Sequence, residues 1–211
     1  MAKYKTGDLF QFEAPGKGPI TARILLDIKR QCIKRGSVAA DSPLRMVAEA
    51  LLVEVYRGSD AQPPQGVDPL IPGVLVDSGG FDTDEWRISG SGVVDPTKVE
   101  FPQALTAYGS DPYFIRGEVK LPLKLSYPDM TRIKVYVAVT PSSWLANIAA
   151  KYLGAESSHI GLARSDLRFS EHRAEVYRGL DDDPNQPYFE FSKKQGFDLS
   201  RFYEPQSRRA G

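Results

Sequence analysis

The chain has 211 residues, of which 41% are hydrophobic, and its 27 Lys and Arg residues equal its 27 Asp and Glu residues in number. This length accommodates one large domain or two small ones, and the apolar fraction is sufficient for a hydrophobic core. A net charge of zero argues against nucleic-acid binding driven by the charge of the whole molecule.

The cysteine content and the N-terminal sequence indicate in which cellular compartment the protein is expected. Cys32 is the single cysteine, so no intrachain disulfide can form and a reducing compartment is expected. The first ten residues contain no apolar targeting segment, and no apolar run has the length of a membrane span. We therefore expect a cytoplasmic protein that does not associate with a membrane.

The charge is distributed unevenly along the chain. Residues 60–111 contain nine acidic residues against two basic ones, a net charge of −7, and the segments on either side are mildly basic. A local field of this sign can attract a basic partner even though the whole molecule is neutral.

The N-terminal segment has the pattern of a β-hairpin. Residues 7–13 alternate apolar and polar side chains, residues 14–19 are rich in Gly and Pro, and residues 20–32 predict a long return strand that includes Cys32. Residues 44–56 fit a helix or a strand. We favour a strand over residues 50–56, because Val53, Val55 and Tyr56 are strong β-formers and Gly58 can end the strand.

The central third predicts further short strands, separated by Gly and Pro. The expected strands or extended segments are residues 70–76, 86–88, 99–102, 112–116 and 118–121. Pro102 restricts its segment to a sheet edge, because proline cannot donate a ladder hydrogen bond. Gly117 separates the last two strands or introduces a bulge into a single one.

The C-terminal third predicts one helix among strands. Residues 131–139 alternate most clearly, with four β-branched residues on one face. Residues 143–153 predict a helix with Leu145, Ile148 and Ala149 on its apolar stripe and Gly154 at its end. Further strands are expected near residues 174–177 and 188–191.

A five-residue sequence occurs twice. Glu54-Val55-Tyr56-Arg57-Gly58 recurs as Glu175-Val176-Tyr177-Arg178-Gly179, but the flanking sequences do not align. Because a duplicated domain would repeat over a longer period, we interpret the two copies as strands that end in the same way.

These patterns together predict an α+β fold that is mostly β. We expect a bent antiparallel sheet or partial barrel with the helix on one face. Residues 1–125 would form a β-rich part, and residues 126–205 a strand–helix–strand extension packed on it, with a single domain as the alternative. Residues 206–211 are expected to be a disordered tail.

Candidate catalytic residues are few. Cys32 with His159 or His172 would be needed for a cysteine nucleophile, but the sequence around Cys32 alternates like an ordinary strand. The two histidines lack metal-ligand spacing, and no glycine-rich phosphate-binding motif is present. We therefore expect no catalytic residue, metal or cofactor. A small hydrolase using His159 or His172 with Asp166 or Glu171 is the alternative.

The acidic loop of residues 77–86 is the candidate partner-binding site. It contains four carboxylates and two large aromatic residues: Asp77, Phe81, Asp82, Asp84, Glu85 and Trp86. The spacing of the carboxylates differs from that of a calcium-binding EF-hand loop. Aromatic anchors surrounded by carboxylates have the composition of a binding hot spot. The alternative is that Trp86 belongs to the core and the acids form a solvated turn.

Three short motifs resemble the immunity protein 26 family. They are Tyr4-Lys5-Thr6-Gly7-Asp8-Leu9-Phe10 followed by Thr21-Ala22-Arg23-Ile24-Leu25, then Glu85-Trp86-Arg87-Ile88-Ser89-Gly90, and then Phe101-Pro102. The similarity covers roughly residues 4–125.

The resemblance implies a bacterial antitoxin that binds and blocks a cognate toxin, often a nuclease or deaminase, in the cytoplasm of the producing cell. It implies no catalytic residue and no cofactor. The rivals are the hydrolase described above and a non-catalytic structural component of a bacterial assembly.

Overall fold

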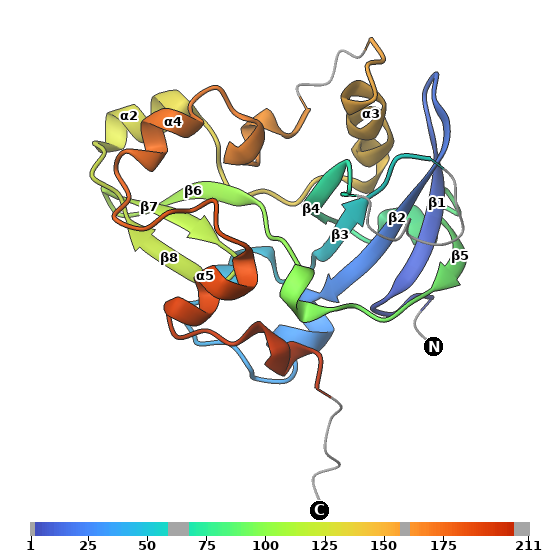
Figure 1. Cartoon of the computed structure of the whole chain (residues 1–211), viewed down its shortest axis with the longest axis horizontal. Coiled ribbons are helices and arrows are strands. Elements are labelled where there is room, and N and C mark those ends of the chain that lie inside the picture. Colours follow the sequence, from blue (N-terminus) through green and yellow to red (C-terminus); the bar gives the residue numbers. More distant parts are fainter. Residues whose placement is uncertain (1–2, 59–67, 157–160, 205–211) are drawn as a thin grey trace, which may run out of the picture.

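Two antiparallel sheets form the framework of the protein (Figure 1). The structure is a computed structural model that describes residues 3–58, 68–156 and 161–204. The five-stranded sheet has the order β4-β3-β2-β1-β5, and the three-stranded sheet has the order β6-β7-β8. The strands are β1 (Asp8–Ala14), β2 (Gly18–Asp27), β3 (Leu51–Val55), β4 (Ile71–Val76), β5 (Arg87–Ser91), β6 (Gln103–Tyr108), β7 (Asp111–Arg116) and β8 (Val119–Pro122).

Helices and short helical turns connect and cover the sheets. The α-helices are α1 (Gly79–Asp82), α2 (Tyr127–Ile133), α3 (Ser142–Tyr152), α4 (Arg173–Tyr177) and α5 (Tyr188–Lys194). The shorter turns are η1 (Ile28–Ile33), η2 (Pro43–Val47), η3 (Pro96–Lys98), η4 (Gly161–Arg164), η5 (Leu167–Phe169) and η6 (Leu199–Phe202). The expected α+β class is confirmed, and neither of the two sheets closes into a barrel. The expected tail at residues 206–211 lies outside the described residues.

The N-terminal hairpin is present, but its second strand is shorter than expected. β1 and β2 pair from Leu9 opposite Arg23 to Ala14 opposite Gly18. β2 ends at Asp27, whose carboxylate accepts a hydrogen bond from the Arg30 N–H and so caps η1. Cys32 therefore lies in a buried helical turn, and its predicted position in a strand is wrong.

The expected helix at residues 143–153 is present as α3, which packs on the five-stranded sheet (Figure 1). Leu145, Ile148 and Ala149 on its inner face join a core cluster with buried side chains of β1 to β4. Burial of this apolar stripe is what fixes the helix, since isolated helices of eleven residues are marginal in water. The start of α3 is thereby held beside β1.

The strand predicted at residues 131–139 is wrong. Residues up to Ile133 form α2, because the Ser126 side chain caps the Asp129 N–H and Pro128 occupies the first turn. The residues after Lys134 are extended, but they join neither sheet. They form single bridges instead, Tyr136 to Leu105 of β6 and Thr140 to Val76 of β4, and so connect the two sheets.

The two strands predicted near the C-terminus are also wrong. Residues 174–177 lie in α4 and residues 188–191 lie in α5. Val176, Tyr188 and Phe191 are buried in a second core cluster, together with side chains of the three-stranded sheet and of the far end of β2. The segment 126–204 therefore contributes helices to both cores.

A candidate acidic groove

A groove of about 630 Å³ lies where three segments of the chain meet. Its walls are formed by the end of β1 with Pro19 of β2, by residues 84–87, and by the first turns of α3. Phe12 and Trp86 contribute buried apolar surface, and most of the exposed lining residues are charged. A concave surface with a few polar groups around an apolar floor is a common form of binding site.

Three carboxylates lie on this groove. Glu13 of β1 and the consecutive residues Asp84 and Glu85 all line it, and all three are exposed. None of them forms an ion pair or side-chain hydrogen bond with another described residue. Arg87 is the single cationic residue of the lining that the structure describes, so the groove has a net charge of about −2. We call Glu13, Asp84 and Glu85 the groove carboxylates.

The pairing of β1 with β5 explains how these carboxylates meet. β5 is antiparallel to β1, and Gln11 lies opposite Arg87. Continuing this register by two residues brings Glu13 toward Glu85. Asp84 has a φ of 59°, in the left-handed region that Asp tolerates better than most residues, and it turns the chain into β5.

Phe81 and Trp86 are buried in the core, so of the two interpretations of Trp86 the structure shows the core position, and neither side chain is an exposed anchor. Each is only 4% exposed. Trp86 stacks on Phe10 with ring centroids 4.6 Å apart and meets Phe81 edge-on at 5.1 Å. Tyr4 stacks on Phe81 with ring centroids 4.8 Å apart. This aromatic cluster fixes the loop from beneath, and one edge of Trp86 remains at the groove.

The other two predicted acids have local partners. One Asp77 carboxylate oxygen accepts the Gly79 N–H at 2.8 Å, and the other accepts the Ser142 N–H at 3.1 Å. Asp77 therefore caps α3 from a different part of the chain. Asp82 forms an exposed ion pair with Lys3 at 3.4 Å. The four predicted acids are thus divided, and only Asp84 and Glu85 line the groove.

Two residues beside the groove were missed from the sequence. Glu13 is more than seventy positions away from Glu85, so only the strand register could reveal it. Trp144 was interpreted as part of the helix, but it is 51% exposed and follows Ser143 of the groove wall. Its large apolar side chain lies outside the predicted stripe of Leu145, Ile148 and Ala149, and this was the available signal.

Of the residues of the hydrolase alternative, the structure brings His172 and Glu171 together and places Asp166 elsewhere. His172 lines a second pocket of about 400 Å³, and its Nδ1 and Nε2 atoms lie 3.5 Å from Glu175 and 3.7 Å from Glu171. Asp166 is fully buried elsewhere, paired with Arg168 at 2.7 Å. His159 lies outside the described residues.

Asp166 belongs to a buried ionic network beside the three-stranded sheet. Arg168 bridges Asp166 and Glu100, and Glu100 also binds Arg116. Burial lowers the pKa of Arg116, an effect that the neighbouring Glu100 opposes. The Arg116 guanidinium donates to the carbonyls of residues 184 and 186, which holds the segment before α5 in place. The network therefore joins β7 to η5 and to the segment before α5, which is a structural role.

Cys32 is completely buried, and burial raises the pKa of its thiol well above the ordinary value. A thiol in this environment stays protonated and is a poor nucleophile. Among the described residues, no group of three or more His, Cys, Asp or Glu side chains is placed to hold a metal ion. In the same part of the chain, no helix combines the length and apolar character needed to cross a bilayer.

No protein-family model matches the chain, and comparisons with curated proteins and with solved structures also give no match.

Proposed function

We propose that this protein is an immunity protein that binds and blocks a toxin carrying a basic surface, and that the acidic groove receives that surface. The observation that carries the proposal is the convergence of Glu13, Asp84 and Glu85 on one groove, where none of them pairs with a cationic side chain of the described residues. Like charges held together in this way are unfavourable for the isolated protein unless a partner neutralises them.

The chemistry of the groove fits a toxin that acts on nucleic acid or nucleotides. Such a toxin needs a positively charged cleft to hold phosphate groups. Carboxylates presented on a rigid edge can occupy that cleft in place of phosphates, and opposite charges accelerate the encounter. The groove is rigid because Trp86 and Phe12 beneath it are core residues and Asp77 fixes the start of α3.

The surroundings of the groove provide apolar contacts for the same interface. Trp144 on α3 and Ile88 on β5 are 51% and 45% exposed, although both are large hydrophobic side chains. Exposed aromatic and aliphatic residues beside a charged groove are typical of protein interfaces, where they supply most of the binding energy. The inhibitor would act by occlusion in the cytoplasm of the producing cell and would need no catalytic residue.

Co-expression tests this proposal. The terminal toxin domain of a large reading frame adjacent to this gene should arrest a bacterial host when expressed alone. Co-expression of this protein should restore growth, and the two proteins should co-purify as a complex. Growth arrest that persists despite full expression of the folded protein would contradict the proposal.

A variant separates binding from catalysis in the same assay. His172→Ala should protect the host as well as the wild type does, because the groove does not include His172. Loss of protection by a folded His172→Ala protein would favour the hydrolase alternative.

A further inference from the structure

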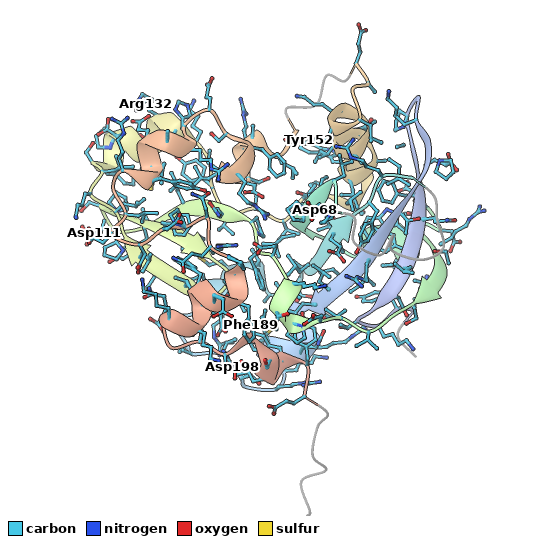
Figure 2. The ribbon with its side chains drawn as sticks, viewed as in Figure 1. Asp68, Asp111, Arg132, Tyr152, Phe189 and Asp198 are labelled. Carbon is cyan, nitrogen blue, oxygen red and sulfur yellow. The ribbon has the colours of Figure 1, made fainter. Side chains whose placement is uncertain are left out.

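We propose that the second pocket, which lies between α2 and residues 163–172, binds a small phosphate-bearing anion. This pocket is about 400 Å³ and is separate from the acidic groove, with which it shares no lining residue. Arg132 and Lys134 at the end of α2 and Arg164 of η4 are the cationic side chains that line it. Figure 2 shows Arg132 on α2, at the side of the molecule away from β1.

Two of these cations are not neutralised. Neither Lys134 nor Arg164 forms an ion pair or side-chain hydrogen bond with another described residue. Arg132 binds Glu175, but a guanidinium has five N–H donors, and this contact uses one nitrogen. Three cations from two segments around one hollow repel one another, and a bound anion would relieve this repulsion.

The acidic groups near the pocket do not cancel this charge. Glu171 lines the pocket, but its side chain is 89% exposed and lies 3.7 Å from His172. Glu175 is occupied by Arg132 and faces the other ring nitrogen of His172. The lining has three cations against one carboxylate, and with Glu175 paired to Arg132 the net charge around the pocket is about +1 when His172 is neutral.

The arrangement favours phosphate over a carboxylate. A phosphate presents oxygens in several directions and carries up to two charges, which suits cations that approach from different segments. Ser170 adds a neutral donor. Its Oγ accepts a hydrogen bond from the backbone N–H of His172 at 3.1 Å, so its own hydroxyl hydrogen can be donated to a ligand. Ile133 and Phe169 supply apolar lining for the organic part of a phosphate ester.

The backbone holds Lys134 at the pocket. Lys134 ends α2 in the left-handed conformation, with a φ of 56°, and its N–H binds the Met130 carbonyl at 3.3 Å. Lysine is an unusual choice for this conformation, which Gly or Asn adopts at lower cost. The presence of a lysine here is consistent with a role for its positive charge in the pocket. Lys134→Asn would remove the charge and keep a residue that adopts the left-handed conformation.

Titration with inorganic phosphate and with adenosine monophosphate tests the proposal. The full chain, labelled with ¹⁵N, is titrated at constant ionic strength while amide shifts are followed. We expect saturable shifts at residues 132–134, 164 and 169–172, and little change at residues 84–87. Tighter binding of the nucleotide would identify a phosphate ester held partly by the apolar lining, and equal binding would identify recognition of the phosphate group alone.

Matched variants provide the decisive comparison. Lys134→Asn with Arg164→Gln should weaken binding of both probes about tenfold or more, because each charge-assisted contact is lost. Lys17→Asn with Lys98→Gln removes two exposed cations outside the pocket and should leave binding unchanged. Thermal unfolding without phosphate checks that both proteins fold. Absence of saturable shifts, or equal affinities of the two double variants, would overturn the proposal.

Discussion

Trp86 lies directly against Gly80, so closely that a Cβ atom at position 80 would be only 2.3 Å from Cδ2 of the indole. The two residues are also joined through the backbone, since the Trp86 N–H binds the Gly80 carbonyl at 2.9 Å. The loop that carries Asp84 and Glu85 runs between these two points. Its shape therefore depends on the contact between the glycine and the indole.

Gly80→Ala should destabilise the protein by about 1–3 kcal/mol, because a side chain there forces the indole out of the aromatic cluster. The free energy of unfolding in urea measures this effect. Gly92→Ala is the control, since a Cβ atom there would have no neighbour within 4 Å. Equal stabilities of the two variants would mean that Trp86 is not fixed by position 80.

Ile148→Asp should destabilise the protein by about 3 kcal/mol or more, because it buries an unpaired charge between α3 and the sheet. Asn147→Asp, on the same helix but outside its buried stripe, should change stability much less. Thermal denaturation of both proteins measures the difference. An unchanged midpoint for Ile148→Asp would show that α3 does not pack on the sheet.

The thiol of Cys32 should not react with a thiol-specific reagent in the native protein, even at pH 8 to 9. Burial raises the pKa of this thiol, so the thiolate is not formed in the pH range where a free cysteine ionises. Full reaction should follow addition of denaturant. Rapid native labelling would contradict the buried position in η1.

Asp166→Asn should cost about 3–5 kcal/mol of stability, because it leaves Arg168 buried without its main partner. Chemical unfolding measures the loss. Asp183→Asn, which alters an exposed carboxylate in the turn before α5, is the comparison and should change stability much less. An Asp166→Asn protein with the stability of the wild type would contradict the structural role of this network.

The repeated pentapeptide shows most clearly where sequence patterns reach their limit. Glu54 and Val55 of the first copy lie in β3, between two neighbouring strands, and Glu54 pairs with Arg23 of β2. Residues 175–177 of the second copy lie in α4, where Glu175 pairs with Arg132 of α2. Because identical residues adopt both conformations, tertiary contacts decide the structure here.

Short-range sequence patterns were sufficient to predict the first hairpin and the helix α3. The hairpin of β1 and β2 and the helix α3 follow from alternation, a Gly- and Pro-rich turn and an apolar stripe. α2 was missed because the alternation after Ile133 outweighed the helix-start residues Ser126 and Pro128 in our interpretation. α5 was missed in the same way, although Pro187 precedes it and two lysines end it.

The candidate site was predicted in part. Asp84 and Glu85 could be selected because acidic residues are concentrated in one stretch of sequence. The burial of Trp86 and Phe81 and the arrival of Glu13 depend on how β1 packs and pairs, which a single sequence does not specify. The basic pocket could not be predicted, because its cations come from segments separated by about thirty residues and are joined only by the fold.

We propose that the groove carboxylates steer the protein to a basic partner. Reversing Glu13, Asp84 and Glu85 together to Lys should slow association with the toxin domain that passes the co-expression test. At low salt the rate constant should fall by about an order of magnitude or more. The loss should shrink as salt shortens the screening length to about 8 Å at physiological ionic strength.

A control with the same change in net charge separates local from global effects. Reversing Asp111, Glu190 and Glu204 alters three exposed acids outside the groove, and Figure 2 shows Asp111 at the side of the molecule remote from β1. Stopped-flow association rates of both triple variants, measured across a salt series, distinguish steering by the groove from an effect of net charge. We predict a much slower, salt-dependent association for the groove variant and a smaller change for the control. Equal rates at every salt concentration would contradict the proposal that the groove is the binding site.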